Sequence, residues 1–204
     1  MRTPRITTPR SVVPVVATLI GALLGGCGAS RTGTIPSSLL RSLRPIGVGP
    51  RFQPPVAGPI LGRCRHDLGA RTPVHVEVFA ADRVIIIPAG IGTRPPRVRI
   101  AGRITRARCS GELVTLEPTG VILIRAGQAL TLSDLFRSWG QPLTARHLAG
   151  FTAPPGRPVT AYVAGRLRPG PPGRIPLTPY AEIVVEVGPH VPPHHAFTFA
   201  SSER

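Results

Sequence analysis

Residues 74–88 read VHVEVFAADRVIIIP, two apolar segments joined by a short polar stretch. In the first segment apolar residues alternate with His75 and Glu77, and a period of two is typical of a β-strand with one buried face. The polar stretch 81–83 leads into a second apolar run, 84–87. Two such runs separated by a short turn predict a β-hairpin, and we expect this hairpin to lie near the start of the folded part of the chain.

The rest of the pattern adds strands and one helix. Residues 131–140, TLSDLFRSWG, place apolar residues at i, i+3, i+4 and i+7, with Thr131 or Ser133 to cap the start and Gly140 to end the helix. Strands are expected at 97–100, 112–117, 121–124, 159–163 and 181–187, the second and third of them forming another hairpin around 118–120. We therefore predict an α+β fold, a β-rich sheet with hairpins and one short helix, in a β-grasp-like order.

The chain is strongly basic and unusual in composition. Its 204 residues carry 25 Lys and Arg against 9 Asp and Glu, a formal net charge of +16, and all 25 cations are arginine. Glycine (23) and proline (26) together make up about a quarter of the chain, so part of it must be irregular. This composition excludes a coiled coil, a helical bundle and a multi-span membrane protein.

The first 27 residues have the pattern of an export signal. The start MRTPRITTPR carries three arginines and no acid, and the apolar run 12–24 is shorter than the ~20 residues of a spanning helix. The run ends in Leu24-Gly25-Gly26-Cys27, which resembles the lipobox of bacterial lipoproteins. The resemblance implies a signal peptide over 1–26 and a diacylglyceryl group on Cys27, which would hold the protein on the extracytoplasmic face of the cell membrane. The alternative is a plain signal peptide with an incidental cysteine.

The signal also affects the charge and the organisation of the chain. Cleavage before residue 27 removes three arginines and no acid, leaving +13 of the +16. Residues 28–62 contain twelve Gly or Pro and no acid, which is typical of an irregular tether. We therefore expect a lipidated cysteine and a tether over 27–62, a β-rich head over 63–199 and a tail over 200–204.

Several short runs in the head belong to one pattern. They are PAGIG at 88–92, TGVI at 119–122, WGQPL at 139–143, VTAYVAG at 159–165, IPL at 175–177 and FTF at 197–199. With these runs, residues 64–199 resemble an uncharacterised family of exported prokaryotic proteins, whose members also carry His-x-His-x-His-Leu and His-Thr-His-Asp motifs. In that family the alternate histidines of one strand face imply a transition-metal site.

Most of those histidines are replaced in this chain. Pro73, His75 and Glu77 stand at the first motif, and residues 114–117 read VTLE at the second. His75, Glu77 and Glu117 remain as candidate ligands for zinc or copper, because imidazole and carboxylate groups bind such ions and the first two residues share a strand face. The alternative is that His75 is an ordinary strand residue beside an exposed glutamate, with no cofactor.

Two cysteines remain in addition to Cys27. In an oxidising extracytoplasmic compartment we expect Cys64 and Cys109 to form one disulfide, which closes a 46-residue loop. The alternative is a redox-active or nucleophilic cysteine, although the chain contains no Cys-x-x-Cys.

Three histidines cluster near the C-terminus. His190, His194 and His195 lie in a proline-rich stretch. Clustered histidines can bind metal, but a flexible tail does not orient its ligands. We interpret the cluster as a solvated tail.

The densest run of charge lies between residues 94 and 108. It holds six arginines and no acid: Arg94, Arg97, Arg99, Arg103, Arg106 and Arg108. Such a run predicts contact with anionic lipid head groups or another anionic component of the cell envelope. Export and an aromatic fraction of 4% argue against a nucleic-acid partner. The alternative is a compositional bias that turns every surface cation into arginine.

Motifs of catalysis are missing from the sequence. Gly-x-Ser-x-Gly, His-Glu-x-x-His and a phosphate-binding glycine loop do not occur. We therefore expect a non-enzymatic binding or interaction module, attached to the membrane through diacylglyceryl-Cys27. A degenerate transition-metal-binding domain is the second hypothesis.

Overall fold

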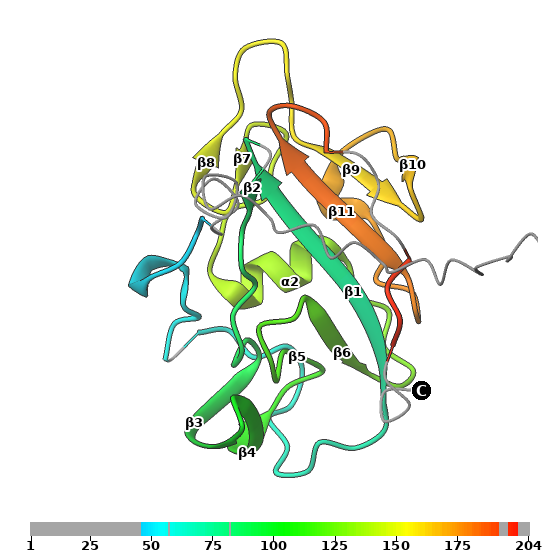
Figure 1. The fold of residues 1–204 in the computed structure, drawn as a ribbon. Coiled ribbons are helices and arrows are strands. Elements are labelled where there is room, and N and C mark those ends of the chain that lie inside the picture. The colour runs from blue at the N-terminus through cyan, green and yellow to red at the C-terminus, as the bar shows by residue number, and fades with distance from the viewer. Residues whose placement is uncertain (1–45, 57, 82, 192–195, 200–204) are drawn as a thin grey trace, which may run out of the picture. The chain divides into compact units, whose positions relative to one another are not determined.

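The computed structural model describes residues 46–56, 58–81, 83–191 and 196–199, all within one compact unit that spans 36–204 (Figure 1). The predicted signal peptide, Cys27 and the first part of the predicted tether lie outside the described residues. Among the described residues, no helix is both long enough and apolar enough to cross a membrane.

The unit is built on one seven-stranded mixed sheet, in the order β10-β9-β11-β1-β6-β5 with β2 also paired to β1. The strands are β1 (Arg71–Ala80), β2 (Arg83–Val84), β5 (Leu113–Val114), β6 (Val121–Arg125), β9 (Thr160–Val163), β10 (Arg166–Leu167) and β11 (Glu182–Val187). The central strand, β1, is parallel to β11 and antiparallel to β6 and β2. Because β1 and β11 are parallel, the chain between them must cross over, and it does so through α2 (Leu132–Trp139).

The α+β fold that the sequence predicts, β-rich with one short helix among hairpins, is confirmed. The first and last strands of the sheet are parallel neighbours at its centre, and the helix lies between β6 and β9 in the chain. Two smaller pairs and two 3-10 turns complete the structure: β3 (Thr93–Ile100) with β4 (Arg103–Ser110), β7 (His147–Leu148) with β8 (Phe151–Thr152), η1 (Pro50–Phe52) and η2 (Pro172–Arg174).

The helix α2 begins and ends as the sequence predicts. The Asp134 carboxylate accepts the Thr131 backbone N–H at 2.8 Å, and Gly140 adopts the left-handed conformation (φ 76°) that closes the last turn. Its apolar face is buried in the main core together with the inward-facing residues of β1. That face consists of Leu132, Leu135, Phe136 and Trp139.

The predicted hairpin at 74–88 forms, but its second strand has only two residues. The chain then turns inward, where Ile85 donates its N–H to the Val78 carbonyl oxygen at 2.7 Å and pairs with Ile46 in a parallel bridge. Ile85 and Ile87 are buried in the core. The apolar run therefore packs against the core instead of continuing as an extended strand.

The described residues from 46 to 62, predicted as part of the tether, pack against the head instead. Phe52 is 2% exposed, and its carbonyl oxygen accepts a hydrogen bond from Trp139 Nε1 at 2.6 Å. The Phe52 ring also stacks on Phe151, with centroids 6.1 Å apart. An aromatic side chain in this Gly- and Pro-rich stretch is therefore buried beside the helix, within the range predicted as tether.

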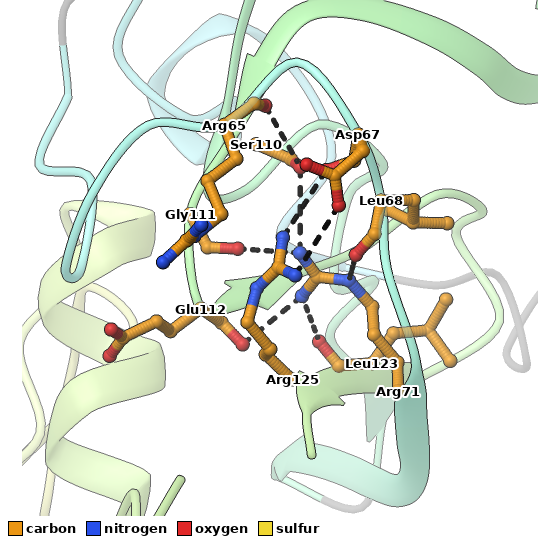
Figure 2. A network of polar contacts seen from close by, with 9 residues as sticks. All are labelled: Arg65, Asp67, Leu68, Arg71, Ser110, Gly111, Glu112, Leu123 and Arg125. Atoms are coloured by element: carbon orange, nitrogen blue, oxygen red, sulfur yellow. Dashed lines mark hydrogen bonds and ion pairs between the residues drawn. The ribbon is translucent and has the colours of Figure 1, made fainter. Parts of the chain in front are cut away.

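Arg71, the first residue of β1, connects the start of the sheet to three other segments (Figure 2). Its half-buried guanidinium has five N–H groups and five acceptors within hydrogen-bond distance. These acceptors are the carbonyl oxygens of Leu68 (2.8 Å), Glu112 (3.1 Å), Leu123 (3.2 Å) and Gly111 (2.6 Å) and the hydroxyl of Ser110 (3.4 Å). The side chain is therefore fully used in holding the fold and has no donor left for a ligand.

A second arginine lies next to Arg71. Arg125 donates to Asp67, from Nη2 to the carbonyl oxygen at 3.2 Å and from Nη1 to the carboxylate at 3.5 Å. Burial and the neighbouring Arg125 charge lower the pKa of Arg71 to about 10. Arg71 therefore remains charged at neutral pH.

We expect Arg71→Met to destabilise the fold by about 3 kcal/mol, because it leaves several carbonyl oxygens without their charged donor. The measurement is the free energy of unfolding from denaturant titration. Arg137→Ala is the control, since Arg137 is exposed and pairs with Asp134 on the helix surface, and its loss should cost at most about 0.5 kcal/mol. Equal losses for the two variants would contradict a central role for Arg71.

Candidate functional site

The arginine run lies on a two-stranded hairpin, β3–β4, that stands apart from the main sheet (Figure 1). The two strands are joined by Ala101 and Gly102, whose φ angles of 47° and 84° are those of a two-residue turn with positive φ at both positions. The sequence predicted a strand only at 97–100. Its partner, β4, was missed because arginine and threonine replace the expected apolar residues along it.

The base of this hairpin is fixed to the head in three ways. Cys64 and Cys109 form the predicted disulfide. Arg65 and Ser110 exchange two backbone hydrogen bonds, at 2.9 and 2.7 Å. Arg71 binds the backbone immediately after β4, so the hairpin leaves the head in a defined direction.

Three of the six arginines are used in internal contacts. Arg97 donates to the Thr93 hydroxyl at 2.8 Å and to its carbonyl oxygen at 2.7 Å, and burial lowers the pKa of Arg97, with the nearby Arg99 charge as the next cause. Arg103 forms an ion pair with Glu117. Arg94 donates to a backbone carbonyl oxygen at 3.3 Å.

The other three arginines, Arg99, Arg106 and Arg108, are exposed. Two aliphatic side chains beside them are exposed as well, Val98 at 49% and Ile100 at 64%. The register pairs Val98 with Arg106 and Ile100 with Arg103, and directly opposed residues share a face of a β-ribbon. One face of the hairpin therefore carries aliphatic and guanidinium groups together.

A second candidate surface lies on the sheet face that carries His75 and Glu77. Three residues of the C-terminal segment (189–191 and 196–199) contact strands of this sheet: His190, Val191 and Phe197. The Phe197 ring stacks on His75 at 3.8 Å between centroids, and its N–H donates to the Glu182 carboxylate at 2.8 Å. His75 is only 7% exposed. A cavity of about 80 Å³ is lined by these residues and by Glu77, Tyr162 and His190.

Glu186 attaches the start of the C-terminal segment to the sheet. Its carboxylate is 2% exposed and lies 2.8 Å from His190 Nδ1 and 3.0 Å from the Val191 N–H, which donates to it. The His190 ring stacks on Tyr162 at 4.7 Å, and burial, followed by the Glu186 charge, raises the pKa of the Tyr162 phenol. His190, whose side chain is 51% exposed, is therefore held against the sheet by two contacts and does not lie free in a tail, which corrects the prediction for this residue. His194 and His195 lie outside the described residues.

The structure brings together two of the three predicted metal ligands. His75 and Glu77 line the cavity, whereas Glu117 is not among its lining residues and forms an ion pair with Arg103 of β4. In the part of the chain that the structure describes, no three His, Cys, Asp or Glu side chains are grouped so as to hold a metal ion.

The sequence missed Glu182, Glu186 and Tyr162 as members of this surface. A signal for the two glutamates was present, because residues four apart on a strand point to the same face. Nothing in the sequence indicated that Phe197 would return to cover His75.

Comparison with known proteins adds no family to this picture. No protein-family model, no curated protein and no solved structure matches the chain. The resemblances to bacterial lipoproteins and to the exported family therefore stay predictions, and the function has to be inferred from the charge and geometry of the two surfaces.

We expect Glu186→Ala to speed hydrogen exchange at the Val191 amide by roughly tenfold, because the amide loses its only carboxylate acceptor while β1 stays intact. The measurement is residue-resolved hydrogen exchange. Glu182→Ala is the matched variant, since its carboxylate binds the Phe197 amide instead. Unchanged exchange at Val191, or the same pattern in both variants, would contradict the role assigned to Glu186.

Proposed function

We propose that this chain is a lipid-anchored, extracytoplasmic binding module without catalytic activity, and that it contacts an anionic component of the cell envelope through the β3–β4 hairpin. The observation that carries the proposal is the charge of this hairpin. Residues 93–110 contain six arginines and no acid, and three of the arginines are exposed on a support fixed by the disulfide and Arg71.

The strength of such a contact depends on local charge rather than on the net charge of the chain. Each cation next to an anionic membrane surface contributes about 1 kcal/mol, so three contribute roughly 100-fold in affinity. Charges farther away than a Debye length, ~8 Å at physiological salt, are largely screened. The hairpin is therefore a better candidate for the contact than the remaining arginines, which are spread over the head.

We expect Cys27→Ala to move the protein from the membrane fraction to the soluble fraction after a high-salt wash. The wash removes electrostatic contacts and leaves only the acyl chains to retain the protein. The measurement is cell fractionation, with Ser30→Ala as a control that leaves the lipobox unchanged. Retention of the Cys27→Ala protein after the wash would contradict lipid anchoring.

We expect Arg99→Glu, Arg106→Glu and Arg108→Glu together to weaken binding to dextran sulfate by at least about 100-fold. The measurement is the dissociation constant over a range of salt concentrations. The control reverses three exposed arginines outside the hairpin, Arg157, Arg166 and Arg168, and so has the same net charge. If both triple variants lose the same affinity, net charge governs binding and the hairpin is not the contact surface.

A further inference from the structure

The exposed aliphatic residues of the hairpin distinguish between possible anionic partners. Val98 is 49% and Ile100 64% exposed, and they lie on the same strand two residues apart. Their cross-strand neighbours are Arg106 and Arg103. A soluble polyanion needs only the arginines, and exposed aliphatic side chains gain nothing from such a partner.

We infer that the hairpin tip, residues 98–106, docks onto an anionic lipid bilayer, with Val98 and Ile100 entering the head-group region and Arg106, directly opposite Val98, at the lipid phosphates. The inference rests on the proposed envelope contact and specifies its partner. A bilayer interface offers both chemistries within a few ångströms, phosphate oxygens for guanidinium groups and acyl chains for aliphatic groups. Arginine suits this boundary because its aliphatic stem can lie among apolar groups while its charge stays in the polar layer.

The architecture of the tip supports shallow insertion. The Ala101-Gly102 turn ends the hairpin, and the backbones of β3 and β4 are paired with each other on either side of it. Ile104, on the opposite face from Ile100, is 2% exposed and packs in the smaller core cluster of the head. The face that Ile104 shares with Arg99 is thus held by the head, and the face with Val98, Ile100 and Arg106 is left outward.

Leu167, another exposed aliphatic residue, serves as the control position for Ile100. Leu167 on β10 is 57% exposed and lies between Arg166 and Arg168. The strand β10 lies at the opposite end of the unit from β3 and β4 (Figure 1). Its strand pairs with β9, next to the strand that carries Glu182 and Glu186, so its surroundings are more acidic than those of the hairpin tip.

The test uses the mature protein purified from membranes, with a nitrobenzoxadiazole label on a cysteine introduced by Ile100→Cys or, as the control, by Leu167→Cys. The disulfide keeps Cys64 and Cys109 out of the labelling reaction, and the wild-type protein reports any labelling of Cys27. The proteins are mixed with vesicles of phosphatidylglycerol and phosphatidylcholine in equal parts, or of phosphatidylcholine alone. Flotation measures attachment to the vesicles, and the emission wavelength of the label measures entry into the bilayer.

We expect the emission of the label at position 100 to shift to shorter wavelength on the anionic vesicles only. The label at position 167 should keep the emission wavelength that it has in the absence of vesicles. The Arg99→Glu, Arg106→Glu pair should abolish the shift. An unshifted label at 100 on vesicles that carry the protein overturns the inference, as does an equal shift at both positions or on both vesicle types. Blocking of the shift by dextran sulfate supports one shared arginine surface.

Failure of the anchor gives a different result. An anchored protein floats with both kinds of vesicle whatever the label reports, whereas a protein without an acyl anchor fails to float with phosphatidylcholine alone. A floating protein with an unshifted label at 100 therefore leaves lipid anchoring standing and removes bilayer docking. If Val98→Thr also removes the shift but leaves dextran sulfate binding unchanged, the aliphatic part of the contact is supported independently of its charge.

Discussion

The Arg71 guanidinium is the contact on which the other features of this unit depend. It lies at the start of the central strand and binds backbone from the loop before β1, from the end of β4 and from β6. A chain with this much glycine and proline has few regular elements to hold such segments in register. A planar group with five donors does so at one point, whereas a lysine ammonium at this position would offer three donors and no fixed plane. The sheet, the loop closed by the disulfide and the β3–β4 hairpin are therefore all connected by the hydrogen bonds of the Arg71 guanidinium.

This junction also explains how the charge is distributed. The hairpin is held at its base by Arg71, the disulfide and the backbone pair of Arg65 and Ser110, so its arginines stay together at one end of the unit. Three of the nine acids, Glu77, Glu182 and Glu186, lie on the main sheet, where Glu182 and Glu186 accept hydrogen bonds from the C-terminal segment. With cations and carboxylates kept apart, few of the exposed arginines are neutralised within the fold. Arg103, paired with Glu117, is the exception on the hairpin among the described residues.

The parts of the structure that the sequence predicted are those with a regular apolar period. Four strands have an alternating or continuously apolar pattern, and the helix has both of its capping residues. The local sequence pattern was therefore sufficient to predict these elements, which are the strands around 74–79, 121–124, 159–163 and 181–187 and the helix α2. The parts it missed are held by long-range contacts. β4 has no apolar period and forms because Arg71 and the disulfide fix it, Phe52 is buried only because Trp139 lies beside it, and Phe197 covers His75 only once the sheet exists. The same holds for the candidate site. The run of six arginines could be recognised in the sequence, but the sequence did not indicate which three of them, Arg99, Arg106 and Arg108, are exposed.

The all-arginine composition has two different explanations at two kinds of position. At Arg71 and Arg97 the side chain donates several hydrogen bonds from one rigid plane, and lysine could not replace it without leaving acceptors unpaired. At exposed positions such as Arg106 a lysine would supply the same charge, so a compositional bias is sufficient to explain the residue type there. Bias does not explain the absence of acids from the hairpin or the two aliphatic side chains that its register places beside arginines. That arrangement depends on where the residues lie rather than on the overall composition. The inference about the partner is therefore based on the surface of the β3–β4 hairpin and not on the net charge of the chain.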